Sequence, residues 1–230
     1  MLTAKKKIVK RDAGNESGFS YATVQAFFLK YGKIVGGVVA GIVIIGVALY
    51  FYEAGKTEDN LQASRMLAKV QTLYQQGQYK LAISGDPSRG IPGLEDIAVK
   101  YDNTPTGQQA MLYLGDCYLY TEQYDKAIST FDNASPSSDL MKAAVAAGIA
   151  TAQYDKGDYA KAAEFYEDAA TTYQNDLLSA DRFLHAAEAY LKAGKKDRAK
   201  EMLEQVKKAK TTKFASDITR LTAEYNINLD

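Results

Sequence analysis

The chain has 230 residues, 47% of them hydrophobic and 24% charged, which is enough for one ordinary domain with an additional segment. Its formal net charge of zero hides an asymmetry: residues 1–33 carry seven basic and two acidic side chains, so the remainder is net acidic. Because a phosphate backbone is bound by clustered lysines and arginines, a mildly acidic main domain argues against a nucleic-acid partner.

The first 33 residues predict two short segments. Residues 1–18 are basic and rich in polar and small side chains, and we expect a disordered cytoplasmic tail there. Residues 19–33 place Phe19, Thr23, Phe27 and Tyr31 at helical spacing. This spacing predicts an amphipathic helix that lies at a membrane surface and contacts lipid.

Residues 34–52 predict a transmembrane helix. These 19 residues contain no charge, amide or proline, and about 20 apolar residues are needed to cross the hydrocarbon core. A cleaved signal peptide fits less well, because its apolar region is shorter, starts sooner and ends in small residues. The basic excess before the span predicts a cytoplasmic N-terminus and a C-terminal domain across the membrane.

Two glycines within this span, Gly37 and Gly41, form a GxxxG pattern. Such spacing lets two membrane helices approach closely, so it predicts a helix-pairing face. The alternative is that glycine is simply frequent in membrane helices.

The rest of the chain, residues 58–230, repeats itself. One set of four residues recurs 35 positions later, as Tyr124, Ala127, Phe131 and Ala134 followed by Tyr159, Ala162, Tyr166 and Ala169. Ala82 and Ala199 mark two further copies, and the extra length after the first copy falls in the turn-rich stretch 84–93. Small residues at a fixed period predict stacked helical hairpins, because no hairpin can bury its apolar stripe alone.

Turn residues and the C-terminus complete this prediction. Gly77, Gly157 and Gly194 are expected between the two helices of a pair. The last 17 residues predict a helix that covers the end of the stack. We therefore expect an all-α chain, with one transmembrane helix followed by an α-solenoid of about four repeats plus a capping helix, nine or ten helices and no strands.

The sequence offers little for catalysis or cofactor binding. His185 is the only histidine and Cys117 the only cysteine, so neither a histidine relay nor a metal site built on several histidines or cysteines can be assembled. We expect no enzyme activity and no cofactor, with His185 packed on a helix and Cys117 buried in the core.

The repeats resemble the tetratricopeptide repeat (TPR), most closely at Leu114, Gly115, Tyr118, Ala127, Phe131 and Ala134. The resemblance implies that the first helix of each pair lines a concave face that receives a peptide from a partner protein. Mapping that face onto this chain gives twelve predicted groove residues. They are Leu67, Gln71, Tyr74, Leu112, Asp116, Tyr120, Ala147, Thr151, Tyr154, Leu184, Glu188 and Leu191.

The whole arrangement also resembles the bacterial YfgM-like family. The resemblance rests on the basic tail, the lead-in Phe27 to Lys33, the single span, the degenerate repeats and the stretch Asn226 to Leu229. It implies an ancillary subunit of the SecYEG translocon in the inner membrane, with its repeat domain in the periplasm. The implied partners are the translocon, a periplasmic chaperone of the prolyl-isomerase type and exported chains, which the protein would bind like a chaperone.

A second function remains open on the same residues. The chain could be a structural subunit or assembly factor of another inner-membrane complex, holding one fixed partner in the groove. The identity of the partner would separate the two.

Overall fold

The computed structural model describes the backbone of residues 21–209 and 211–229, and within them the side chains of residues 42, 44–50, 53–209 and 211–229. The predicted tail 1–18 lies outside the described residues, as do the surroundings of Gly37 and Gly41 and the side chains of segment 19–33 and of most of the predicted span 34–52. The chain divides into two units, Met1–Glu53 and Ala54–Asp230.

One negative finding concerns the predicted membrane helix. Within the part of the chain that the structure describes, no helix has a stretch long and apolar enough to cross a membrane.

The described residues form ten α-helices, one 3₁₀ helix (Pro87–Arg89) and no strand, apart from a single isolated bridge between Asp86 and Ile91. The α-helices are α1 (Tyr21–Gln75), α2 (Tyr79–Ser84), α3 (Leu94–Lys100), α4 (Pro105–Tyr120), α5 (Tyr124–Asp132), α6 (Asp139–Asp155), α7 (Tyr159–Thr172), α8 (Asp176–Lys192), α9 (Lys196–Lys208) and α10 (Ala215–Glu224). This confirms the predicted all-helical repeat domain.

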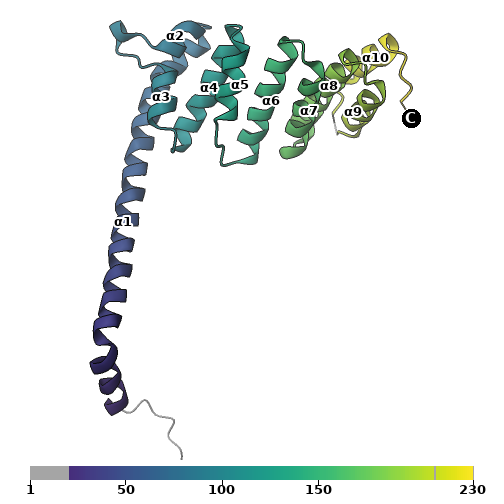
Figure 1. Cartoon of the computed structure of the whole chain (residues 1–230). Coiled ribbons are helices and arrows are strands. Elements are labelled where there is room, and N and C mark those ends of the chain that lie inside the picture. Colours follow the sequence, from purple (N-terminus) through teal and green to yellow (C-terminus); the bar gives the residue numbers. More distant parts are fainter. Residues whose placement is uncertain (1–20, 210, 230) are drawn as a thin grey trace, which may run out of the picture. The chain divides into compact units, whose positions relative to one another are not determined.

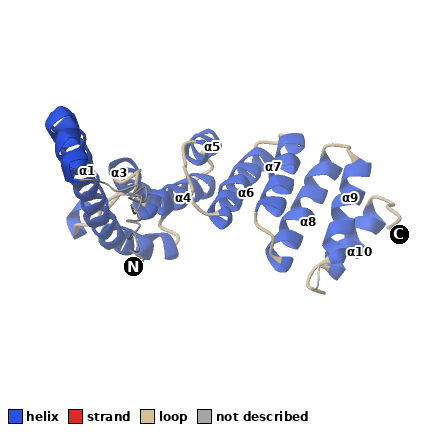
Figure 2. Cartoon of the chain, turned by 90° about the horizontal axis from the view of Figure 1, so that it is seen from below, coloured by secondary structure: helices blue, strands red, loops and turns tan. Residues whose placement is uncertain are grey.

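In the second unit the helices pack in pairs along the chain (Figures 1 and 2). We call the first helix of each pair an A helix and the second a B helix. The A helices are the part of α1 after Glu53, then α4, α6 and α8; the B helices are α2 with α3, then α5, α7 and α9. Helix α10 follows the last pair.

Each A helix after the first begins at a side-chain cap. The side-chain oxygens of Thr104, Ser138 and Asn175 accept hydrogen bonds from backbone amides in the first turns of α4, α6 and α8. These caps satisfy amides that have no partner within the helix, so they determine where an A helix starts.

A left-handed residue follows each A helix and also α10. These residues are Gly77, Glu122, Gly157, Gly194 and Asn226, all with φ between 51° and 87°. After each of the first four left-handed residues, the backbone amide of the following residue donates a hydrogen bond to the carbonyl five residues before it. An example is the bond from Gln123 N to Tyr118 O at 2.8 Å. This bond closes the helix end and turns the chain into the B helix. The three predicted turn glycines are thus confirmed, whereas Glu122 was not predicted.

The first repeat differs from the others because its B helix is split by the stretch 85–93. Gly85 and Gly93 bring two backbone segments together there: a Cβ added to Gly93 would lie 2.4 Å from the Ile83 carbonyl oxygen. Only a residue without a side chain permits this approach. The stretch accounts for the greater length of the first repeat.

Phe131 of α5 packs between the second and the third helix pair. Its ring lies between two glycines of neighbouring A helices, so that a Cβ at Gly115 or Gly148 would come within 2.5 Å or 2.4 Å of ring carbons. The ring is 2% exposed. Three helices therefore meet at one side chain.

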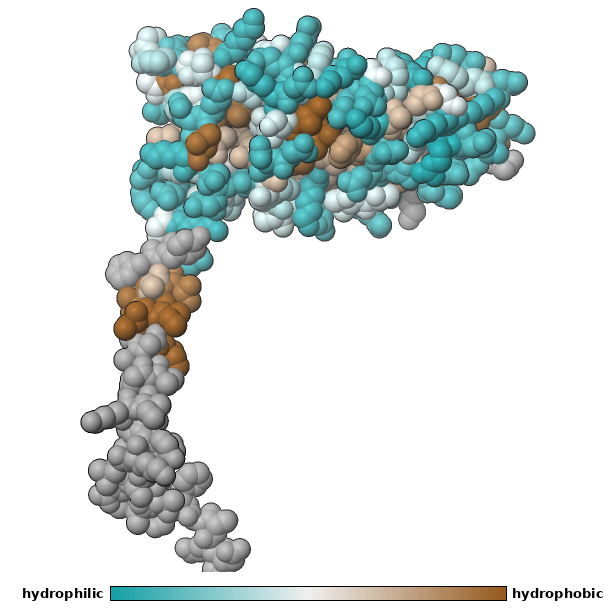
Figure 3. Space-filling view, viewed as in Figure 1, coloured by the Kyte–Doolittle hydropathy of each residue, from teal (hydrophilic) through white to brown (hydrophobic). Residues whose placement is uncertain are grey.

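The buried side chains of the second unit form two clusters. One contains residues of α1 to α6, such as Val70, Ile97 and Phe131, and the other contains residues of α6 to α10, such as Tyr190 and Leu203. The visible face of this unit is largely hydrophilic, with scattered hydrophobic side chains (Figure 3).

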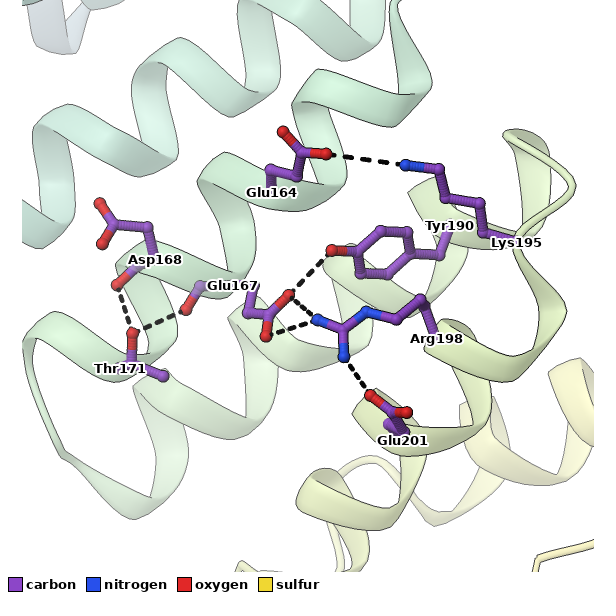
Figure 4. A network of polar contacts seen from close by, with 8 residues as sticks. All are labelled: Glu164, Glu167, Asp168, Thr171, Tyr190, Lys195, Arg198 and Glu201. Carbon is purple, nitrogen blue, oxygen red and sulfur yellow. Dashed lines mark hydrogen bonds and ion pairs between the residues drawn. The ribbon is translucent and has the colours of Figure 1, made fainter.

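A polar network joins the last two pairs (Figure 4). The Glu167 carboxylate of α7 accepts a hydrogen bond from the Tyr190 hydroxyl at 2.8 Å and two from the Arg198 guanidinium at 2.7 and 2.8 Å. Arg198 also pairs with Glu201, and Lys195 lies 3.6 Å from Glu164. The network therefore ties α7, α8 and α9 together at one carboxylate.

Candidate functional site

The A helices carry the twelve predicted groove residues, which the structure separates by burial. Leu67, Leu184 and Leu191 are each 6% exposed and belong to the two core clusters. Tyr120 is 60% exposed, and the remaining eight are half-buried. The surface available to a partner therefore comes from these nine residues and their neighbours, which we call the A-helix face.

Four tyrosines gather where the first repeat meets the second, and we call Tyr74, Tyr79, Tyr113 and Tyr120 the tyrosine cluster. The ring centroids of Tyr74 lie 5.7 Å from Tyr79 and 4.9 Å from Tyr113, both edge-on, and Tyr79 stacks on Tyr120 at 4.2 Å. Edge-on and stacked ring pairs of this kind are favourable beyond their buried area. The cluster is thus a preformed aromatic surface contributed by α1, α2 and α4.

Asp116 lies beside this cluster. The Tyr74 hydroxyl donates to its Oδ2 at 3.3 Å, and burial raises the pKa of Asp116 to about 6. Gln71 likewise donates to the Tyr113 hydroxyl at 3.3 Å. The structure therefore brings together four predicted groove residues, Gln71, Tyr74, Asp116 and Tyr120.

A second tyrosine pair lies where the third repeat meets the fourth. The Tyr154 and Tyr159 rings meet edge-on with centroids 5.2 Å apart. The ammonium of Lys192 lies 4.5 Å from the Tyr154 centroid and 5.0 Å from that of Tyr159. This is a cation–π contact made by the chain itself.

A row of polar contacts continues from α6 to α10. Thr151 and Tyr166 share a hydrogen bond of 3.0 Å, and Tyr166 stacks on His185 at 5.3 Å. His185 lies between Asp181 and Glu188, and its contact with Glu188 raises its pKa. Arg220 of α10 donates to Glu188 at 2.7 Å. Of the predicted groove residues, Thr151 and Glu188 are thus linked through Tyr166 and His185.

Sequence reasoning missed four members of these clusters, Tyr79, Tyr113, Tyr159 and Lys192. Tyr79 and Tyr159 each follow a turn glycine by two positions, so aligning the turns would have found both tyrosines. Lys192 carried no such signal, because its role depends on which neighbouring helix it packs against.

A cavity of about 590 Å³ opens between α7, α8 and α9, with Thr171, Phe183 and Met202 among its lining residues. None of the twelve predicted groove residues lines it. Glu167, which does, is already held by Tyr190 and Arg198. Among the residues that the structure describes, no group of three or more potential ligand side chains could hold a metal ion.

Comparison with protein families decides what the repeats are. Residues 118–176 and 183–209 each match a tetratricopeptide repeat family. The chain is a TPR protein. The matches cover the end of α4, then α5, α6, α7 and α9, and all of α8 except residues 177–182. The split first repeat lies outside them.

No curated protein and no solved structure matches this TPR protein. The resemblance to the YfgM-like family therefore stays a prediction.

Proposed function

We propose that this TPR protein is an adaptor that binds polypeptide segments of other proteins along its A-helix face. TPR domains bind other proteins, which supports an interaction role. The single observation that carries the choice of surface is the aromatic stack of Tyr79 and Tyr120, because Tyr120 stays 60% exposed on a helix that packs on both sides. Tyrosine gives a large contact area at a low cost in conformational entropy, so it suits such a surface.

We propose further that residues 34–52 anchor the chain in a bacterial inner membrane, with the N-terminus cytoplasmic and the repeat domain periplasmic. Six hydrophobic side chains of α1 are 49–71% exposed, namely Ile42, Ile44, Ile45, Val47, Leu49 and Tyr50. Figure 3 colours this stretch hydrophobic. A contiguous exposed apolar surface is typical of a membrane or protein contact, which supports the anchor. Gly37 and Gly41 would then be available to pair with another membrane helix.

By its resemblance to the YfgM-like family, we assign the adaptor to the SecYEG translocon and to a periplasmic chaperone of the prolyl-isomerase type. Exported chains are then its clients. Catalysis is no part of this proposal, because a single histidine and a single cysteine offer neither a histidine relay nor a site built on several such side chains.

Site-specific photocrosslinking in cells tests the adaptor. A photoreactive phenylalanine analogue replaces Tyr120 on the A-helix face, and a matched control replaces exposed Asp132 on B helix α5. We expect Tyr120 to yield crosslinks to many exported chains and Asp132 to yield few. One stoichiometric partner at Tyr120 would instead favour a structural subunit. Equal crosslinking at both positions would refute the choice of surface.

Membrane fractionation tests the anchor separately. The chain should stay with membranes during carbonate washing, and a protease added to spheroplasts should degrade the repeat domain. Release by carbonate, or a protected repeat domain, would overturn the proposed topology without affecting the crosslinking result.

A further inference from the structure

The third and fourth repeats contain a cation site that the chain fills itself. Tyr154 lies three residues before the turn glycine Gly157, and Tyr159 lies two residues after it. The ammonium of Lys192, two residues before the next left-handed residue, lies over both rings at 4.5 and 5.0 Å. The negative faces of two tyrosine rings therefore attract one positive charge there.

The first and second repeats have the same two tyrosines but lack the lysine. Tyr74 and Tyr79 stand three residues before and two residues after Gly77, and their rings meet edge-on as those of Tyr154 and Tyr159 do. At the position equivalent to Lys192 the chain has Tyr120, which stacks on Tyr79 and is 60% exposed. At the first site a third tyrosine, Tyr120, therefore stands where the second site has the cation Lys192.

A negative charge accompanies this change. Asp116 lies six residues before the turn residue Glu122, and its counterpart beside the filled site is Glu188, which Arg220 engages at 2.7 Å. The interactions described for Asp116 are burial and the hydrogen bond from Tyr74, with no cation among them. Two further neighbours on α4, Cys117 and Tyr120, are uncharged at neutral pH.

We propose that Asp116 and the tyrosine cluster form a docking site for one cationic side chain, a lysine or an arginine, of a bound polypeptide. The occupant follows from charge complementarity. The half-buried Asp116 carboxylate has no cation among its described partners, and it lies beside the rings of Tyr74 and Tyr120. Carboxylate and aromatic rings together favour a cation over an anion or a neutral chain. The proposal rests on the proposed function, in which a polypeptide lies along the A-helix face.

The test uses the full-length chain in mild detergent with carbon-13-labelled tyrosine rings, assigned through Tyr→Phe substitutions. The probe is Nα-acetyl-lysine amide, and the neutral comparison is Nα-acetyl-norleucine amide, whose side chain lacks the terminal ammonium group. We expect the lysine probe to shift the ring signals of Tyr74 and Tyr120 until they saturate. The dissociation constant of the lysine probe should be at least about fivefold lower than that of the norleucine probe. Tyr154 and Tyr159, which Lys192 already covers, should respond weakly.

Two Asp→Asn substitutions test whether the charge of Asp116 causes the preference for lysine. Asp116→Asn removes the negative charge at nearly constant shape and should abolish the preference for lysine over norleucine. Asp132→Asn, on the exposed surface of α5, should leave that preference unchanged. Equal binding of the two probes to the wild-type chain, no response at all, or an unaltered preference in Asp116→Asn would each overturn the inference.

The filled site supplies an independent check. Lys192→Ala vacates the ammonium position over Tyr154 and Tyr159, so the lysine probe should now shift these two rings as well. Failure of the probe to bind there would contradict the internal comparison on which the inference rests.

These results are distinguishable from failure of the proposed function. Crosslinks from Tyr120 without a preference for lysine would leave the adaptor standing and remove the cation site. A lysine preference without crosslinks in cells would leave the cation site standing and remove the adaptor.

Discussion

At the scale of single residues, burial of Asp116 lowers the free energy of unfolding at neutral pH. Its pKa is raised from 3.8 to about 6 by burial, so the folded chain binds a proton more tightly than the unfolded chain. Stability from this group is fully present below its unfolded pKa of 3.8 and is lost as the pH rises through about 6.

Asp116→Asn should therefore raise the free energy of unfolding by about 1–3 kcal/mol at neutral pH. The difference from the wild-type chain should shrink as the pH falls toward 3.8, since the wild-type carboxyl is then neutral when folded. Urea unfolding across this pH range measures it. A gain that is the same at every pH would show that burial of the charge is not its cause.

Gly115 acts through one aromatic ring. A methyl group there would lie 2.5 Å from ring carbons of Phe131, so Gly115→Ala should destabilise the chain by about 1–3 kcal/mol, although alanine favours helix more than glycine does. Thermal unfolding measures the loss. Gly55→Ala, in a helix where an added Cβ meets nothing within 4 Å, is the matched control and should not destabilise.

The double substitution Gly115→Ala with Phe131→Leu tests the mechanism. If the clash with the ring is the cause, the alanine should cost less in the Phe131→Leu background than in the wild-type chain. An equal cost in both backgrounds would assign the effect to the glycine backbone instead.

At the scale of elements, the A helices α4, α6 and α8 carry side-chain caps, whereas the B helices α5, α7 and α9 have none. These B helices start directly after a closed turn, so tertiary contacts must hold them. The network around Glu167 is such a contact, because a carboxylate of α7 is shared by Tyr190 of α8 and Arg198 of α9 (Figure 4).

We expect a coupling free energy of about 1 kcal/mol between Glu167 and Arg198, because the carboxylate accepts two hydrogen bonds from one guanidinium and is only partly exposed. A double-mutant cycle with Glu167→Gln and Arg198→Met measures it. The exposed pair Lys142 and Asp139 provides the control cycle, with a coupling near zero. Equal couplings in the two cycles would contradict a special role for the network.

At the scale of the repeat domain, the two core clusters predict that the two halves lose structure separately. Stability in a stack of repeats is roughly a sum over repeats and their interfaces. Leu203, which is 0% exposed, belongs to the second cluster, and Leu73, which is 1% exposed, belongs to the first.

Leu203→Ala should cost about 2–5 kcal/mol locally and increase hydrogen exchange in α8 and α9 more than in α3 and α4. Leu73→Ala should produce the reverse pattern. Exchange followed by mass spectrometry measures both. A uniform increase along the domain in either variant would mean that the repeats unfold as one cooperative unit.

The sequence by itself determined the repeat architecture of this protein. The signals are local: alanines at a period near 35 and glycines at three of the four A-to-B turns. A helix start or a left-handed turn depends on a few neighbouring residues, so a short stretch of sequence encodes it.

Only the tertiary structure decided which A-helix residues remain exposed. Leu67, Leu184 and Leu191 occupy predicted groove positions yet are buried, because exposure depends on the neighbouring helices as well as on the residue's own helix face. Glu122 adopts a left-handed conformation without being glycine, held by backbone hydrogen bonds at the turn. The meeting of Asp116 with Tyr74 joins residues 42 positions apart, and no local pattern specifies a contact of that range.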